Sequence, residues 1–213
     1  MTLSATEEIP LTYSTMVEDA RRGRGEDRIV AVRLTSRTIF AVADGAGGVA
    51  GGAGAADAIC NAVVEQCRLG RVADWSEWLA QVDRAMAGSG VPRLAAAVVA
   101  DVADDGLVTG ASVGDCEAWA FVEGAPMRLT SGQVRKPLLG EGAARPVPFE
   151  AHVAHGTLLM ATDGLWKYMS HDRIAKTAPI RPFKTAVAAF VDGVRLKSGA
   201  LQDDVAVAIC GIG

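Results

Sequence analysis

The sequence predicts an α+β fold built around antiparallel β-structure, and three observations support this class. Short β-rich runs follow one another through turns too short to hold a crossover helix, which makes their pairing antiparallel. Two longer segments, 49–69 and 74–87, instead repeat apolar residues at helical spacing. The chain has 213 residues, of which 50% are apolar, enough for one well-buried core. We therefore expect a single domain spanning residues 1–213.

The first part of the chain is expected to form a strand, a loop and a hairpin. Residues 11–16 alternate weakly, as a half-buried strand does, whereas 17–27 show neither helical nor strand periodicity. Residues 29–34 and 38–43 are rich in strand-forming side chains. Because only three residues separate these two runs, they should pair as a hairpin.

Two helices are expected next. The alanine-rich helix over 49–69 should end at Gly70, which suits a helix C-terminus. Asp74 is a favourable N-cap for the helix over 74–87. Trp75 and Trp78 fall on its apolar stripe, so we assign both to the core.

The rest of the chain returns to short strands and ends with further helices. Residues 130–149 are rich in glycine and proline without clear periodicity, which predicts a long surface loop or small flap. Ser170 is expected to cap a short helix. The predicted strands are 94–100, 107–113, 118–122, 157–161 and 205–210, and the predicted helical segments are 165–169, 171–177 and 182–194.

Composition excludes several classes of function. A formal net charge of -4 and an isoelectric point near 5.4 argue against a nucleic-acid-binding face. The amino-terminal residues lack the basic and apolar regions of a signal peptide, and no apolar run is long enough to span a bilayer. Cys60, Cys67, Cys116 and Cys210 show no zinc-binding spacing and are interpreted as reduced thiols. We expect a soluble cytoplasmic protein with no membrane partner.

Two predicted strands each end on an aspartate that is followed at once by glycine. Asp44-Gly45 follows the strand over 38–43, and Asp163-Gly164 follows the strand over 157–161. Such a step offers a hard cation both a carboxylate and a peptide oxygen. Other acids also lie at strand margins, namely Glu26, Asp27, Asp115, Asp203 and Asp204.

Carboxylates gathered at one sheet edge would repel one another unless cations held them. Ligation by oxygen alone favours Mg²⁺ or Mn²⁺ over zinc. A carboxylate shared by two such ions would permit two-metal hydrolysis of a phosphoryl group.

A competing interpretation is a dinucleotide-binding fingerprint. Residues 45–50 fit the pattern G-x-G-x-x-A between a strand and a helix, and Glu65 follows about twenty residues later. That motif requires a parallel βαβ unit, whereas the preceding runs form a hairpin. The aspartate before the glycines would also place negative charge near the pyrophosphate. This interpretation is therefore disfavoured.

Five short motifs occur in order along most of the chain: Gly25-Glu26-Asp27, Val42-Ala43-Asp44-Gly45-Ala46-Gly47-Gly48, Val113-Gly114-Asp115-Cys116-Glu117-Ala118, Ala161-Thr162-Asp163-Gly164-Leu165-Trp166 and Asp203-Asp204-Val205-Ala206-Val207. In this order they resemble the motifs of the metal-dependent serine/threonine protein phosphatases, also called PPM or type 2C phosphatases. The resemblance implies a four-layer α-β-β-α sandwich of two antiparallel sheets flanked by helices. It also implies hydrolysis of phosphoserine or phosphothreonine by direct attack of a metal-bound hydroxide at a binuclear Mn²⁺ or Mg²⁺ centre.

The resemblance also implies roles for individual residues. Asp44 would bridge both metals and Gly45 would lend its carbonyl. Asp163 and Asp203 would complete the shell of one metal. Glu26 and Asp27 would lie around the other metal. Asp115 with Asp163 would match a third-metal site known in bacterial relatives. Arg22, beside Arg21 and Arg24, would be the arginine that binds the substrate phosphate.

The partners implied are a phosphorylated protein substrate and an opposing serine/threonine kinase, with the protein itself a monomer.

The chain departs from the family pattern at several positions. Ala46 stands where many members carry a histidine proposed as general acid, Cys116-Glu117 replaces Ser-Arg, and Asp204 replaces Asn. The flap over 130–149 is shorter than usual.

These departures motivate an alternative, a catalytically weak pseudophosphatase that binds phosphoproteins as a regulatory module. His152, His155 and His171 match no family ligand and are interpreted as surface or loop residues.

Overall fold

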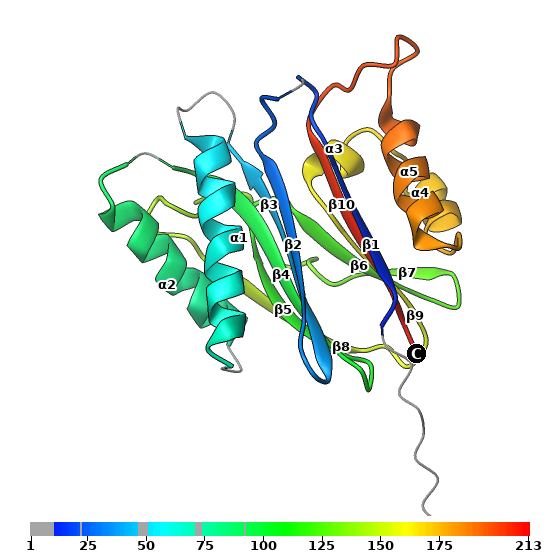
Figure 1. Ribbon diagram of the computed structural model, residues 1–213, viewed down its shortest axis with the longest axis horizontal. Helices are drawn as coiled ribbons and strands as arrows, with labels where there is room; N and C mark the ends of the chain where they lie inside the picture. The colour runs from blue at the N-terminus through cyan, green and yellow to red at the C-terminus, as the bar shows by residue number, and fades with distance from the viewer. Residues whose placement is uncertain (1–10, 22, 47–50, 71–73, 92) are drawn as a thin grey trace, which may run out of the picture.

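The computed structural model describes residues 11–21, 23–46, 51–70, 74–91 and 93–213. It has four layers, in which two stacked five-stranded sheets lie between two groups of helices (Figure 1). The α-β-β-α arrangement expected from the motifs is therefore confirmed.

One sheet contains the predicted hairpin and is covered by the first two helices. Its strand order is β2-β3-β4-β5-β8. The register places Asp27 opposite Asp44 at the end of the hairpin. The strands are β2 (Asp27–Arg33), β3 (Arg37–Gly45), β4 (Ala95–Ala103), β5 (Leu107–Val113) and β8 (Val147–His152).

The other sheet joins strands from the two ends of the chain. Its order is β1-β10-β9-β6-β7. The strands are β1 (Tyr13–Glu18), β10 (Val205–Ile212), β9 (Gly156–Ala161), β6 (Glu117–Val122) and β7 (Ala125–Arg128). All strand pairs among the described residues are antiparallel. The parallel unit that a dinucleotide fingerprint requires is thus missing from this part of the chain.

The helices lie on the outer faces of the sandwich (Figure 1). Asp74 caps the second helix as expected, because its side chain accepts hydrogen bonds from the backbone of Ser76 and Glu77. Ser170 occupies the N-cap position of α4, but its side chain makes no capping bond. The helices are α1 (Gly52–Arg68), α2 (Trp75–Gly88), α3 (Asp163–Trp166), α4 (His171–Thr177) and α5 (Phe183–Val194).

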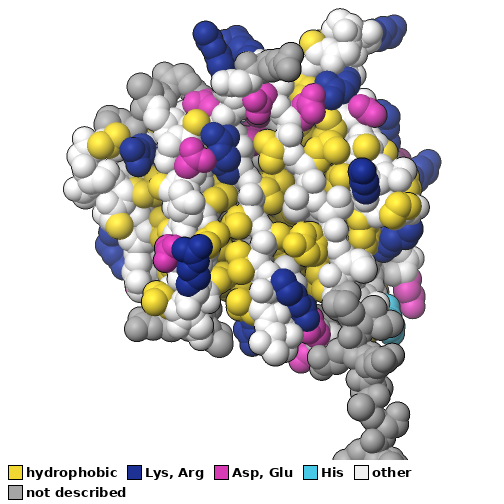
Figure 2. Space-filling model, in the orientation of Figure 1, with side chains coloured by type: hydrophobic (Ala, Val, Ile, Leu, Met, Phe, Trp, Pro, Cys, Tyr) yellow, Lys and Arg dark blue, Asp and Glu magenta, His cyan; other side chains and the backbone are white. Residues whose placement is uncertain are grey.

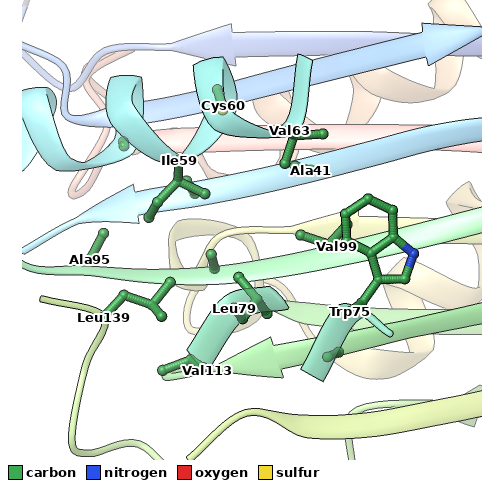
Figure 3. Packing of buried hydrophobic residues seen from close by; sticks show 14 of the residues in the cluster. Ala41, Ile59, Cys60, Val63, Trp75, Leu79, Ala95, Val99, Val113 and Leu139 are labelled. Atoms are coloured by element: carbon green, nitrogen blue, oxygen red, sulfur yellow. The ribbon is translucent and has the colours of Figure 1, made fainter. Parts of the chain in front are cut away.

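Alternation along the strands produces three apolar layers. In β3, Ile39 and Ala41 face α1, whereas Phe40 and Val42 face the other sheet. Figure 3 shows the outer layer, in which Ile59 of α1 is one of the side chains packed on the first sheet. The second sheet packs in the same way against α3, α4 and α5. Trp75 is buried and Trp78 packs against the same cluster, as the helical stripe predicts.

The structure also bears on the cysteines and on membrane segments. All four cysteines are free and buried. Among the described residues, no helix is both long enough and apolar enough to cross a bilayer.

The structure differs from the sequence-based prediction at two edge strands and at the ends of several elements. α3 lies over Asp163–Trp166 where a helical segment was expected over 165–169, and β4 runs to Ala103, three residues past the expected end. β7 was not predicted because its four residues are all exposed and show no apolar alternation. β8 lies partly within the expected loop over 130–149, where Pro148 argues against a strand. Proline is tolerated there because β8 is the edge of its sheet. β1 also runs two residues further than the predicted strand, to Glu18.

The short flap is held against the body of the molecule. Leu139 is fully buried and pairs with Ala95 through two backbone hydrogen bonds. The buried carboxylate of Asp83 in α2 accepts hydrogen bonds from the backbone N–H groups of Gly140, Gly142 and Ala144 at 2.7, 3.0 and 2.9 Å. One side chain therefore satisfies three donors of this loop.

We predict that Asp83→Ala destabilises the protein, because three backbone donors lose a charged acceptor. The expected loss is about 2–3 kcal/mol in the free energy of unfolding, which corresponds to a fall in Tm of roughly 5–10 °C. Thermal unfolding monitored by circular dichroism measures it. Asp105→Ala is the matched control, since Asp105 is exposed in a turn and accepts a single exposed hydrogen bond, from the backbone N–H of Leu107. Equal Tm values for the two variants would contradict the role given to Asp83.

Candidate metal centre

Three carboxylates from different parts of the chain meet at one end of the sandwich. Asp44 ends β3 with Gly45, Asp115 lies in the turn between β5 and β6, and Asp163 begins α3 directly after β9. Each offers a ligand oxygen, and these oxygens all lie within 4.8 Å of one another. Acidic side chains gather along the upper edge of the molecule in Figure 2. Strand ends of both sheets therefore supply one oxygen-rich site.

The cluster opens into a cleft of about 410 Å³. All seven residues predicted as metal ligands line this cleft, although Asp44, Asp115 and Asp163 are the three brought closest together. Arg22, the predicted phosphate-binding residue, lies outside the described residues. The seven predicted ligands are Glu26, Asp27, Asp44, Gly45, Asp115, Asp163 and Asp203.

Steric contact explains the glycine in both Asp-Gly steps. Gly45 is still part of β3, and a Cβ atom there would lie 2.3 Å from the backbone of Gly52 at the start of α1. A Cβ atom on Gly164 would lie 1.9 Å from the carbonyl oxygen of Asp204. Only glycine allows these close backbone approaches. Each glycine thus lets another backbone segment pack directly beside the Asp-Gly step.

Thr162 links the two sheets beneath the cleft. Its hydroxyl donates to Asp27 Oδ2 at 2.7 Å and accepts from the backbone N–H of Ala206 at 2.9 Å. Thr162 and Asp27 are both buried. This bond orients the Asp27 carboxylate, which lies beside Asp44 across the hairpin. Sequence reasoning assigned no role to Thr162, although it lies directly before Asp163.

Asp204 holds the two ends of the basic loop. Its two carboxylate oxygens accept from the backbone N–H groups of Ala20 and Glu26, each at 2.7 Å. Arg21 and Arg24 are exposed on the loop between these contacts. The acid at position 204, a departure from the family pattern, thereby positions both Glu26 and the arginines.

Burial and mutual repulsion make the carboxylates of the cleft hard to ionise without a cation. Burial, followed by the charges of Asp27, Asp163 and Asp115, raises the pKa of Asp44 to about 9. Burial also raises the pKa of Asp27 to about 7, although the Thr162 hydrogen bond opposes it. The pKa of Asp163 is raised mainly by burial. A divalent cation would relieve this repulsion, so the all-oxygen donor set fits Mg²⁺ or Mn²⁺.

Two cationic side chains are already paired with this cluster. Lys167 forms ion pairs with Asp163 and, at 3.6 Å, with Asp203. Arg135 contacts Asp115 Oδ2 at 2.7 Å from the flap. Sequence reasoning missed both residues. The signal for Lys167 is its position four residues after Asp163, which places it one helical turn away.

Two further departures, Cys116 and Glu117, have structural roles outside the cleft, whereas Ala46 is among the residues that line it. Cys116 is fully buried in the layer between the sheets, and burial raises the pKa of its thiol well above the usual range. Glu117 pairs with Arg128 of β7 at 2.7 Å and accepts from the indole of Trp119. His171 packs against the Trp119 ring. None of the three histidines is among the residues that line the cleft.

Comparison with known proteins identifies the fold. No protein-family model matches the sequence, and no curated protein matches it. A solved bacterial serine phosphatase is similar over 95% of this chain and 98% of its own, with a TM-score of 0.81 and 15% identity.

Two named phosphatases are similar as well. The catalytic domain of the serine/threonine phosphatase PstP, solved with two manganese ions, has a TM-score of 0.78 at 17% identity and covers 95% of this chain and 99% of its own. PppA of Pseudomonas aeruginosa, a key regulatory component of T6SS, has a TM-score of 0.74 at 17% identity over 94% of this chain and 96% of its own. The chain has the fold of the PPM-type phosphatases.

We predict that Asp44→Asn stabilises the metal-free protein at pH 8. The folded state holds a proton on Asp44 up to about pH 9, whereas the unfolded chain loses it near the ordinary pKa of 3.8. Stability of the native protein should therefore fall as pH rises between these values, and asparagine removes that dependence. Tm at pH 8 in chelator should rise by at least roughly 2–4 °C, the shift that about 1 kcal/mol produces in a domain of this size.

Mn²⁺ should stabilise the native protein, by an amount that grows with the ratio of the free metal concentration to Kd. Asp44→Asn should lose this stabilisation. Asp105→Asn is the control for loss of an exposed carboxylate and should leave both properties unchanged. A lower Tm for Asp44→Asn than for the native protein at pH 8 would contradict the prediction, because it would mean that the Asp44 carboxylate stabilises the folded protein.

Proposed function

We propose that the protein is a metal-dependent serine/threonine phosphatase. The observation that carries this proposal is the convergence of Asp44, Asp115 and Asp163 at the strand ends of a PPM-type fold. Enzymes with this architecture include a phosphatase solved with two manganese ions. The chemistry of the cleft and the fold thus favour the same class of reaction.

Asp44, with the neighbouring Gly45 carbonyl, would hold two ions jointly. Asp163 and Asp203 would complete one shell, and Glu26 with Asp27 the other. When bound, Mn²⁺ or Mg²⁺ would activate water and stabilise charge on the phosphoryl oxygens. Thr162 and Asp204 would act as positioning residues, because they orient Asp27 and Glu26.

The basic loop before β2 would bind the phosphate of the substrate. Arg22, flanked by Arg21 and Arg24, would supply the guanidinium fork that matches phosphate oxygens. The contacts of Asp204 with Ala20 and Glu26 hold the ends of this loop beside the cleft. The substrate would be a phosphoserine or phosphothreonine protein, and the activity would oppose a serine/threonine kinase.

A second candidate is a pseudophosphatase that binds phosphoproteins without turnover. The ion pairs of Lys167 with Asp163 and of Arg135 with Asp115 favour it, because they neutralise two of the three clustered carboxylates. Ala46 also supplies no proton to a leaving alcohol. Metal-dependent turnover distinguishes the two candidates.

We predict that the protein hydrolyses p-nitrophenyl phosphate and a phosphothreonine peptide only with Mn²⁺ or Mg²⁺. Chelation should abolish the activity. Asp44→Asn and Asp163→Asn should each lower kcat at least about a hundredfold, because each removes a carboxylate that would hold the ions. A colorimetric assay of released phosphate measures the effect on the peptide.

Asp192→Asn is the matched control, since Asp192 is an exposed carboxylate on α5 and does not line the cleft. Full activity in chelator, or in both site variants, would exclude the metal mechanism. Binding of Mn²⁺ and phosphopeptides without turnover on a broad peptide panel would favour the pseudophosphatase.

A further inference from the structure

Lys167 bridges two carboxylates that are proposed to hold the same metal ion. Its Nζ atom forms an ion pair with Asp163 Oδ2 and lies 3.6 Å from Asp203 Oδ2. Asp163 begins α3 and Lys167 caps its C-terminal end, so the helical turn brings the two side chains together. Asp203 approaches from the segment before β10. One ammonium group therefore neutralises charge that a metal ion would otherwise neutralise.

The Lys167 side chain has room to leave this position. It is 42% exposed, whereas Asp163 is 13% exposed. A lysine ammonium is carried on a flexible four-carbon stem and is strongly hydrated, which favours its movement into solvent. Both carboxylates, which lie in the cleft, would then be open to another cation.

We propose that Lys167 is a built-in competitor for the metal, whose ammonium must leave Asp163 and Asp203 before a divalent ion occupies that side of the cleft. The inference rests on the proposed metal centre. Breaking the ion pair of Lys167 costs free energy, which lowers the apparent affinity of this position for a divalent ion. The active state therefore depends on the concentration of free divalent metal. When the concentration of free divalent metal is low, the Lys167 ammonium stays paired with Asp163 and Asp203 and occupies the position of the ion.

Arg135 is expected to compete less. Its side chain is 73% exposed and pairs with a single carboxylate, Asp115. Exposed ion pairs contribute little because water and salt screen them. Lys167 instead contacts two acids, one of which is largely buried.

The test is a titration with Mn²⁺, in which electron paramagnetic resonance reports the free ion and calorimetry reports the stoichiometry. Lys167→Gln should bind Mn²⁺ at one position about tenfold more tightly than the native protein, a difference of about 1.4 kcal/mol. Lys167→Arg keeps the charge and should stay within about threefold of native. Lys176→Gln is the matched control for loss of an exposed lysine on α4 and should also match native.

Equal or weaker binding by Lys167→Gln would overturn the inference, as would tightening by Lys167→Arg to the same extent. If neither the native protein nor Lys167→Gln bound Mn²⁺, both this inference and the metal centre would fail. Tighter binding by Lys167→Gln without phosphatase turnover would support this inference while contradicting the proposed catalytic function.

A second readout follows the displaced side chain itself. Acylation of lysines, mapped by mass spectrometry, should show a rise in the reactivity of Lys167 at saturating Mn²⁺, while Lys176 stays constant. Unchanged or reduced reactivity of Lys167 on metal binding would show that the ammonium is not displaced.

Discussion

Repulsion among partly buried carboxylates is the constraint on which the candidate site depends. Asp44 lies beside Asp27 across the hairpin and within reach of Asp115 and Asp163. Such a group stays neutral or requires a cation, because burial removes the water that would solvate its charge. Ionisation of these carboxylates in the folded chain therefore costs free energy that neutral side chains would not. This is the usual compromise between stability and a functional site.

The fold supplies what is needed to hold these acids together. Two sheets packed face to face bring the end of β3 against the start of α3, and Gly45 and Gly164 allow backbone contacts that any side chain would block. Hydrogen bonds from Thr162 and to Asp204 then orient the surrounding acids. Lys167 and Arg135 supply positive charge in the metal-free protein. Two cations of the chain itself therefore pair with acids to which a divalent ion is proposed to bind.

Local signals in the sequence predict much of this architecture. The three-residue connection between the hairpin runs indicates antiparallel pairing, and the two Asp-Gly steps point to one acidic site. The expectation that these acids share one sheet edge is wrong, because Asp44 ends a strand of one sheet and Asp163 follows a strand of the other. The helix starting after Asp74 follows from capping chemistry. In contrast, β7 and β8 lack apolar alternation because both are edge strands with few buried side chains.

The supporting roles of Thr162, Asp204 and Asp83 were missed for a different reason. Thr162 contacts a residue 135 positions away, and Asp204 contacts one 184 positions away. Asp83 accepts hydrogen bonds from the backbone of a loop that follows it by about sixty residues. Their roles depend on tertiary contacts that no local pattern encodes. The predicted acids are different, because each lies next to a strand end that can be recognised in the sequence.

In the proposed metal centre, Asp44 would be shared by two metal ions. A crystal of the protein grown with Mn²⁺, with data collected at the manganese absorption edge, tests it most directly. We expect two anomalous peaks about 3.5–4 Å apart, the spacing of two-metal sites. Both peaks should lie within bonding distance of the Asp44 carboxylate, and Lys167 should be turned away from Asp163. A cleft without anomalous peaks at saturating Mn²⁺, or peaks that do not touch Asp44, would contradict it.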